Sequence, residues 1–324
     1  MPVKNVIEAS SLTKYYGELC AVDHVNFTVK RGEVFGFLGP NGAGKTTTIR
    51  ILVGLTAPTE GTAYINDLDI RKDIVQIKQH IGVVPDTSNL YDELTAWENL
   101  EFMAGLYHVP RENREKRAQE LLKSFDLWDR RGTRFGKLSS GLKRRMTIAA
   151  ALIHNPNILF FDEPTSGLDV MSARSLRSLL RELTETGVTT FLTTHYIEEA
   201  DQLCERIAII VKGRIVTIDT PQNLKLKFQK VPTIEVSFTT PIKSSSLEEL
   251  KAIDQVKVSE NRMRGQTKNV NETIKELTAF AEEHDLEILH VNTITPNLED
   301  AFVRLTGLES ETMLVEKERR GGRG

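Results

Sequence analysis

The residues best suited to chemistry lie at positions 39–47, which read GPNGAGKTT. Their spacing fits G-x-x-x-x-G-K-[ST], a loop that holds phosphates. Glycines allow a tight turn with backbone N–H groups pointing inward, and a helix that follows adds positive potential at its N-terminus. In such a loop Lys45 reaches the terminal phosphates and the Thr46 hydroxyl holds Mg²⁺. The pattern predicts a nucleoside triphosphate site, and a glycine-rich turn without a ligand is the alternative.

The residues around this loop predict the structure that it requires. Residues 34–38 are apolar and predict a buried strand, while residues 46–55 predict a helix. A strand, a loop and a helix in this order bring the loop's N–H groups to a helix N-terminus. This context favours the phosphate-binding interpretation over the simple turn.

Two acids follow a second apolar strand. Residues 158–161 read ILFF and lead into Asp162 and Glu163. A buried strand of an α/β sheet delivers its carboxyl end to the ligand crevice. There Asp162 could hold Mg²⁺ through water, and Glu163 could orient or activate a hydrolytic water. Without the phosphate loop, solvated acids at a strand end would be the simpler interpretation.

Two further segments are candidates for contacts with phosphate. His195 follows a predicted strand at residues 189–194, and at the same sheet edge its imidazole could hydrogen-bond a γ-phosphate. Residues 138–141 read LSSG and begin a helix whose serine cap leaves the N-terminus open to an anion. Taken alone, a structural histidine and an ordinary N-cap explain both segments.

Composition limits the class of protein. The net charge of −3 over 324 residues gives no reason to expect nucleic acid. Cys20 and Cys204 are far apart and outside any CxxC spacing, so neither a disulfide framework nor a zinc site is indicated. Residues 1–5 contain no apolar signal, and the longest apolar runs are much shorter than the ~20 residues of a membrane span. We expect a soluble, cytoplasmic chain.

Short apolar runs alternate with helical patterns as far as residue 220, which predicts an α/β domain around a mainly parallel sheet. Strands are predicted at residues 22–29, 34–38, 62–65, 81–84, 158–161, 189–193, 207–211 and 215–218. Only short turns join the first two of these strands, so we predict that they form an antiparallel flap.

The pattern changes after residue 221. Strands are predicted at 233–238, 256–259 and 286–291, with helices at 247–253 and 272–283. This order indicates a small α+β unit of the ferredoxin-like kind, although residues 262–269, which should supply a further strand, are polar throughout. Residues 296–302 predict a closing helix, and the charged, glycine-rich residues 311–324 predict a disordered tail. The predicted domains are therefore 1–220, with a helical subdomain at about 90–155, and 221–310.

Together these segments resemble the nucleotide-binding subunit of an ATP-binding cassette (ABC) transporter over about residues 5–220. Residues 39–47 match the Walker A loop of the family, and residues 138–142 lie at its signature motif. Asp162 and Glu163 match Walker B with its catalytic glutamate, residues 166–169 match the D-loop, and His195 matches the switch histidine. Tyr16 matches the aromatic residue that stacks on adenine, with Tyr15 as a neighbouring competitor.

The resemblance implies a P-loop cassette fold, the cofactors ATP and Mg²⁺, and a role for each matching residue. Glu163 and His195 would be catalytic, and Thr46, Asp86 and Asp162 would hold the metal. The nucleotide would contact Tyr16, Gly39, Pro40, Asn41, Gly42, Ala43, Gly44, Lys45, Thr46, Thr47, Asp86, Ser139, Ser140, Gly141 and Asp169. Ser139 and Gly141 would act on the nucleotide of the opposite subunit.

Two segments depart from the family pattern. Asp86 stands where the family usually has the glutamine of its Q-loop. In the signature, Ser140 replaces a glycine and Leu142 replaces a glutamine. We expect Leu142 to affect coupling or rate more than binding. For Asp86, the alternative to a metal contact is a solvated side chain that caps the following turn.

The end of the chain indicates the subclass. Residues 297–307 read NLEDAFVRLTG and are similar to the end of drug-exporter-type ABC ATPases, whose permease is a separate multi-span membrane protein. The resemblance implies an ATPase homodimer that lies on the inner face of the cell membrane through the permease, with no nucleic acid partner. The alternatives are a non-transport ABC ATPase that acts on ribosomes or nucleic acid, and a regulatory module that binds ATP without turnover. A single cassette without sustained heptads or a basic face argues against the first, and Glu163 with His195 against the second.

Overall fold

The computed structural model describes residues 4–228, 232–241, 250, 252–294 and 297–308. Within these residues the chain forms two compact units, one from residues 4–221 with 305–308 and the other from residues 222–304. The helix predicted at 247–253 falls mostly on residues that are not described, and the predicted tail at 311–324 lies wholly outside the described residues. The first unit contains two sheets and the second contains one, and each unit has its own hydrophobic core.

A six-stranded sheet in the order β10-β9-β3-β8-β7-β6 forms the centre of the first unit. Its strands are β3 (Val34–Leu38), β6 (Ile81–Val84), β7 (Ile158–Asp162), β8 (Thr189–Thr194), β9 (Arg206–Val211) and β10 (Arg214–Asp219). All neighbours pair in parallel except β9 and β10, which confirms the predicted mainly parallel sheet. Strands β3, β7 and β8 are buried along their whole length, as expected when both faces of a parallel sheet are covered.

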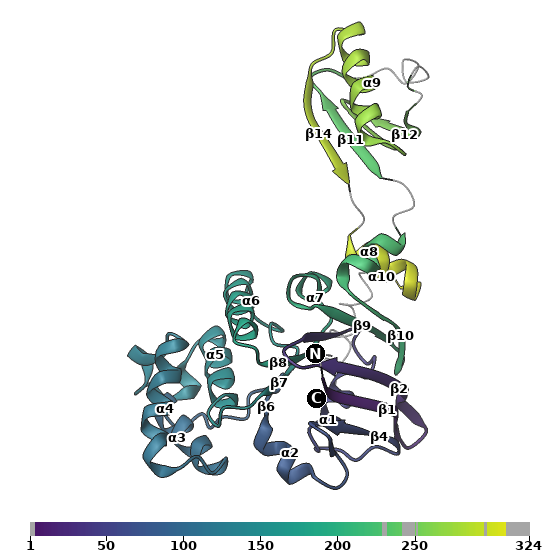
Figure 1. Cartoon of the computed structure of the whole chain (residues 1–324). Coiled ribbons are helices and arrows are strands. Elements are labelled where there is room, and N and C mark those ends of the chain that lie inside the picture. Colours follow the sequence, from purple (N-terminus) through teal and green to yellow (C-terminus); the bar gives the residue numbers. More distant parts are fainter. Residues whose placement is uncertain (1–3, 229–231, 242–249, 251, 295–296, 309–324) are drawn as a thin grey trace, which may run out of the picture. The chain divides into compact units, whose positions relative to one another are not determined.

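Seven helices of this unit surround or extend the sheet (Figure 1). They are α1 (Lys45–Leu52), α2 (Ile74–His80), α3 (Ala96–Leu106), α4 (Arg111–Ser124), α5 (Ser140–Ala151), α6 (Val170–Glu185) and α7 (Ile197–Leu203), with 3₁₀ turns at Trp128–Arg130 and Phe135–Lys137. Helices α3, α4 and α5 pack against one another and form a separate helical group at one side of the sheet (Figure 1). A capping box between Thr95 and Glu98 begins α3, because each side chain bonds the other residue's backbone N–H.

A second sheet corrects one prediction. It has the order β2-β1-β4-β5, formed by β1 (Asn5–Tyr16), β2 (Leu19–Lys30), β4 (Glu60–Ile65) and β5 (Leu68–Asp69), and all of its pairs are antiparallel. The predicted antiparallel sheet is present, but its pairing of strands 22–29 and 34–38 is wrong, since β2 pairs with β1 while β3 lies inside the parallel sheet. The physical reason is burial. Strand β3 is buried at every residue, which requires cover on both faces, and a strand inside a parallel sheet has that cover while a strand of an exposed flap does not.

The second unit contains a four-stranded antiparallel sheet in the order β12-β13-β11-β14. Its elements are β11 (Thr233–Phe238), β12 (Asp254–Ser259), β13 (Arg262–Gln266), β14 (Ile288–Ile294), α8 (Pro221–Phe228), which begins at the boundary, α9 (Val270–Glu283) and α10 (Leu298–Thr306). The polar segment at 262–269 does supply a strand. Met263 and Gly265 are buried while Arg262 and Arg264 are exposed, so the two arginines lie on the open face.

Two remaining features concern cysteine and the membrane. Cys204 is a buried free thiol and Cys20 is a half-buried one. In the part of the chain that the structure describes, no helix is both long and apolar enough to span a bilayer.

Candidate nucleotide-binding and hydrolytic site

Three neighbouring parallel strands bring the predicted site together. Because β8 lies between β3 and β7, the carboxyl ends of all three strands meet at one sheet edge. The Gly39 N–H donates to the Thr194 carbonyl at 3.3 Å, and the Glu163 N–H donates to the Thr193 carbonyl at 3.0 Å. These bonds fix the start of the phosphate loop and the acidic pair to the same strand, β8.

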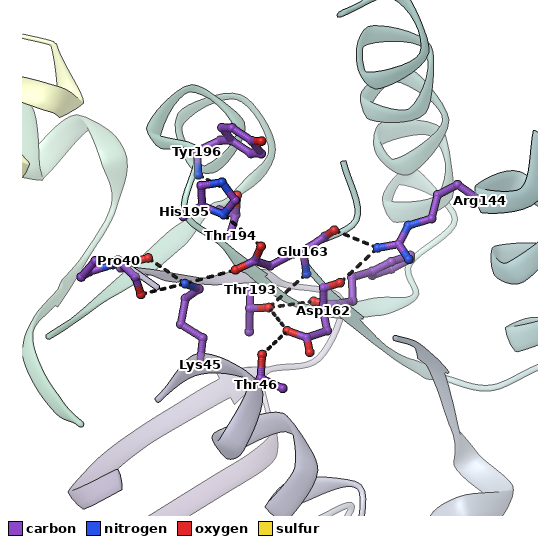
Figure 2. A network of polar contacts seen from close by, with 12 residues as sticks. Pro40, Lys45, Thr46, Arg144, Asp162, Glu163, Thr193, Thr194, His195 and Tyr196 are labelled. Atoms are coloured by element: carbon purple, nitrogen blue, oxygen red, sulfur yellow. Dashed lines mark hydrogen bonds and ion pairs between the residues drawn. The ribbon is translucent and has the colours of Figure 1, made fainter. Parts of the chain in front are cut away.

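The loop from Gly39 to Gly44 needs glycine for steric reasons. Gly44 has φ +102° and caps helix α1 in the left-handed region. A Cβ atom at Gly44 would lie 2.3 Å from the Ala21 carbonyl oxygen, and one at Gly39 would lie 2.2 Å from the Ile210 carbonyl oxygen. The loop therefore turns directly into α1, whose first residues Lys45 and Thr46 face the sheet edge (Figure 2).

Lys45 is the buried cation of the site, with only 4% of its surface exposed. Its Nζ donates to the carbonyls of Gly39 at 2.8 Å and Pro40 at 3.0 Å, and lies 3.3 Å from Glu163 Oε1. Burial lowers the pKa of Lys45, and the negative charges of Glu163 and Asp162 oppose that shift. The ammonium is thus held in place by three oxygen atoms.

Glu163 lies between Lys45 and His195 (Figure 2). Its Oε2 is 3.0 Å from His195 Nδ1, and its backbone has φ +47°, a left-handed conformation that is costly for a residue with a side chain. Burial would raise its pKa, but the His195 hydrogen bond and the charges of Lys45 and His195 outweigh burial and lower the pKa to about 2. Glu163 is therefore a carboxylate at neutral pH and accepts a hydrogen bond from His195.

Asp162 points to the other side of the same turn, toward α1. Its Oδ1 accepts hydrogen bonds from Thr46 Oγ1 at 3.1 Å and Thr193 Oγ1 at 2.6 Å. Burial raises the pKa of Asp162, whereas the two threonine hydroxyls lower it. A carboxylate and a hydroxyl side by side are oxygen ligands of the type that Mg²⁺ prefers. Among the described residues, no three or more His, Cys, Asp or Glu side chains form a group that could hold a metal ion.

A cavity of about 310 Å³ opens in front of these groups. It is lined by Tyr16, Leu19, Ala21, Asn41, Gly42, Gly44, Lys45, Thr46, Thr47 and Glu163. Of the two neighbouring tyrosines, Tyr16 is the one that lines this cavity, and 45% of the surface of this residue is exposed. The volume of the cavity is that of a small-molecule site, and a lining that includes an aromatic ring and a lysine suits a nucleotide.

The structure does not bring the signature residues into this cavity. Ser139 caps α5 by accepting from the Leu142 N–H, and with Gly141 it lines a separate cavity of about 440 Å³. Asp169 caps α6, since its carboxylate accepts from the Ser172 N–H at 2.9 Å and the Ser172 hydroxyl at 2.6 Å. Ser140 is exposed at the start of α5.

Asp86 follows β6 and is connected to the site through Arg144 and through its charge. Its main-chain carbonyl accepts from Arg144 Nη1 at 3.3 Å, and its negative charge contributes to the raised pKa of Asp162. Asp86 is therefore close enough to act on Asp162 through charge. The described contacts of Asp86 run through its main chain and not to Thr46 or Lys45.

Sequence reasoning missed two residues of this network, Thr193 and Arg144. Thr193 stands opposite Asp162 in the β7–β8 pairing, a register that strand patterns alone do not give. Arg144 lies in a run of three basic residues, 143–145, and only the helical period of α5 distinguishes the buried one. The sequence signal that could have found Arg144 is its place on the apolar face of the predicted helix.

Comparisons with known proteins agree with this geometry. The ABC transporter family model matches residues 22–166. The chain is 36% identical over 306 residues to the linearmycin resistance ATP-binding protein LnrL of Bacillus subtilis, covering 93% of this chain and 98% of that protein. It is 39% identical over 241 residues to the probable multidrug ABC transporter ATP-binding protein YbhF of Escherichia coli, covering 73% of this chain but only 42% of YbhF. Among solved structures, the dimeric ATP-binding cassette MJ0796 in a post-hydrolysis state with ADP and Pi is 33% identical. It has a TM-score of 0.60 and covers 66% of this chain and 98% of that one.

Proposed function

This chain belongs to the ABC transporter family, and from that membership we propose that it is the ATP-hydrolysing subunit of an export complex. The relatives that match it along nearly their whole length include the linearmycin resistance protein, whose name states ATP binding and drug resistance. The chain spans only 42% of the length of YbhF. The export function, the partner permease and the position at the inner face of the cell membrane are parts of this proposal.

The observation that carries the proposal is the position of Glu163 between Lys45 and His195. Lys45 holds the terminal phosphates, and the Glu163 carboxylate, ionised at neutral pH, accepts a proton or a hydrogen bond from the attacking water. His195 donates to Glu163 Oε2 and orients it. A carboxylate fixed from both sides is preorganised for this task and loses little freedom in the transition state.

Mg²⁺ belongs to the same proposal. Thr46 and Asp162 would hold it, because their oxygens lie 3.1 Å apart at the start of α1. When bound, the ion neutralises charge on the transferring phosphoryl group. Thr193 keeps Asp162 oriented through the 2.6 Å hydrogen bond, whether or not the ion is present.

The location of the signature residues supports a homodimer as part of this proposal. Ser139 and Gly141 line a cavity separate from the one that Lys45 lines. Two copies arranged head to tail would bring the α5 N-terminus of one copy to the phosphates held by the other, where the helix end favours an anion. Each nucleotide would then be enclosed by both subunits.

Glu163→Gln tests the proposal. This variant keeps the size of the side chain and removes the charge, so we expect phosphate release to fall by about 10² or more while ATP binding persists. ATP should also produce a dimer of the variant that light scattering detects. The matched control is Glu198→Gln, whose side chain is 72% exposed and pairs with Arg177. A parent rate in Glu163→Gln would show that Glu163 is not the catalytic carboxylate.

A further inference from the structure

Arg144 connects three separate parts of the site through main-chain carbonyls. It lies in α5 and has only 7% of its surface exposed. Its Nε donates to the Pro164 carbonyl at 2.7 Å, and its Nη2 donates to those of Asp162 at 3.0 Å and Glu163 at 2.9 Å. Its Nη1 donates to the carbonyls of Pro85 and Asp86. The guanidinium thereby joins α5 to the turn after β7 (Figure 2), and it also joins α5 to the loop after β6.

These contacts fix the positions of backbone groups. All three nitrogens of the side chain are used, and every one of these acceptors is a backbone oxygen. Burial lowers the pKa of Arg144, and the charges of Asp86, Glu199, Asp162 and Glu163 oppose that shift. Since arginine stays charged in proteins, the group keeps its five donors in a planar fork. A lysine carries its three donors on a single nitrogen and cannot span the separate carbonyls that the three guanidinium nitrogens reach.

The turn that Arg144 holds is the one that needs support. Glu163 has φ +47°, and strain of this kind persists only where the surroundings over-determine the backbone. The carbonyls of residues 162, 163 and 164 are all bound by Arg144, so the guanidinium fixes consecutive peptide groups on both sides of the strained residue.

We propose that Arg144 is a positioning residue for ATP hydrolysis, a clamp that ties helix α5 to the backbone of Glu163 and of Asp86. This inference rests on the proposed catalytic role of Glu163. Helix α5 begins at the signature residues Ser139 and Gly141. Arg144 lies in the same helix, five residues after Ser139 and three residues after Gly141. A displacement of the signature by a second subunit is thus transmitted to the carboxylate that activates water. Nucleotide affinity depends on the loop at residues 39–47, which Arg144 does not contact.

Arg144→Met and Arg144→Lys test the clamp. Methionine keeps the length and removes every donor, while lysine keeps the charge and one donor centre. We expect Arg144→Met to lower kcat by about 10- to 100-fold, the size of effect that a misplacement of about 1 Å produces. The Kd for a fluorescent ATP analogue should stay within about threefold of the parent value, and Arg144→Lys should recover part of kcat. The matched control is Arg114→Lys, because Arg114 also holds one backbone carbonyl, that of Val109, but lies in α4.

The double variant Arg144→Met/Glu163→Gln identifies the route of the effect. If Arg144 acts through Glu163, the double variant is no slower than Glu163→Gln alone. A loss of kcat in the double variant that equals the product of the two single losses would overturn the clamp. A folded Arg144→Met variant with the parent kcat would overturn it too. An equal loss of kcat and of ATP affinity, or failure of both Arg144 variants to fold, would make Arg144 a structural residue only and overturn the proposal. A parent rate in Glu163→Gln alone would instead overturn the catalytic assignment, so the two failures are distinguishable.

Discussion

Lys45 and Glu163 form an ion pair at the end of the parallel sheet, with Nζ and Oε1 3.3 Å apart and 4% and 13% of the side chains exposed. The pair joins the phosphate loop to the acidic turn across 118 positions of the chain. A buried ion pair stabilises a structure only where hydrogen bonds satisfy the remaining donors and acceptors of both groups. Two carbonyls do so for Lys45, and His195 does so for Glu163.

Lys45→Ala should weaken ATP binding itself. A charge-assisted hydrogen bond contributes about 1.5–3 kcal/mol, so its loss should raise the Kd for ATP by about 10- to 100-fold. Equilibrium binding of a fluorescent ATP analogue measures this effect. Lys4→Ala is the control, because Lys4 forms an exposed ion pair with Asp67 in the same unit. Unchanged ATP affinity in Lys45→Ala would contradict the assignment of the phosphate loop.

His195→Ala should separate orientation from binding. His195 Nδ1 donates to Glu163 Oε2 at 3.0 Å, and without this bond the carboxylate keeps Lys45 as its partner but loses its second fixed contact. We expect hydrolysis to fall by about 10- to 100-fold, with a much smaller change in ATP affinity. His290→Ala, an exposed position in the second unit, is the control for general effects of losing a histidine. If phosphate release by His195→Ala matches the parent, the histidine is structural.

Much of this site could be predicted from the sequence because its residues lie at the ends of short apolar strands. Asp162, Glu163 and His195 each follow such a strand, and parallel strands end at one sheet edge. The pairing partner of β2 could not be predicted in this way. Strand β1 mixes polar and apolar residues, and only its contacts with both β2 and β4 identify it as the centre of the second sheet. The partners of Arg144 could not be predicted either, because they are backbone carbonyls, which any residue type supplies.

Removal of residues 229–324 should leave nucleotide binding intact. Residues 222–304 form a unit with a core of its own, and every residue that lines the cavity around Lys45 lies before position 164. We expect the shortened chain to bind ATP within about threefold of the parent, by the same fluorescence assay, and to lose dimer formation or coupling to the permease instead. Far-UV circular dichroism provides the folding control. A folded, soluble truncation that binds no nucleotide would show that the C-terminal residues help to form the site.

Asp86→Asn should change how hydrolysis depends on Mg²⁺. The Asp86 carbonyl is held by Arg144, so the substitution leaves the backbone contact in place and removes only the side-chain charge. That charge acts on Asp162, which shares a hydrogen bond with Thr46 at the proposed metal position. A negative charge near the site attracts the ion but repels the γ-phosphate. The variant should therefore need a few-fold more Mg²⁺ for half-maximal phosphate release, while its ADP affinity changes little.

Mg²⁺ titrations of phosphate release for the parent, Asp86→Asn and a control decide between the two interpretations of this position. Asp92→Asn is the matched control, because Asp92 is 66% exposed and pairs with Lys143 on the helical group. A shift in Asp86→Asn alone assigns the charge to the metal site. Superimposable curves for all three proteins would mean that Asp86 acts only through its carbonyl, as an acceptor for Arg144. In that case the aspartate would fill the position of the usual glutamine without taking part in metal binding.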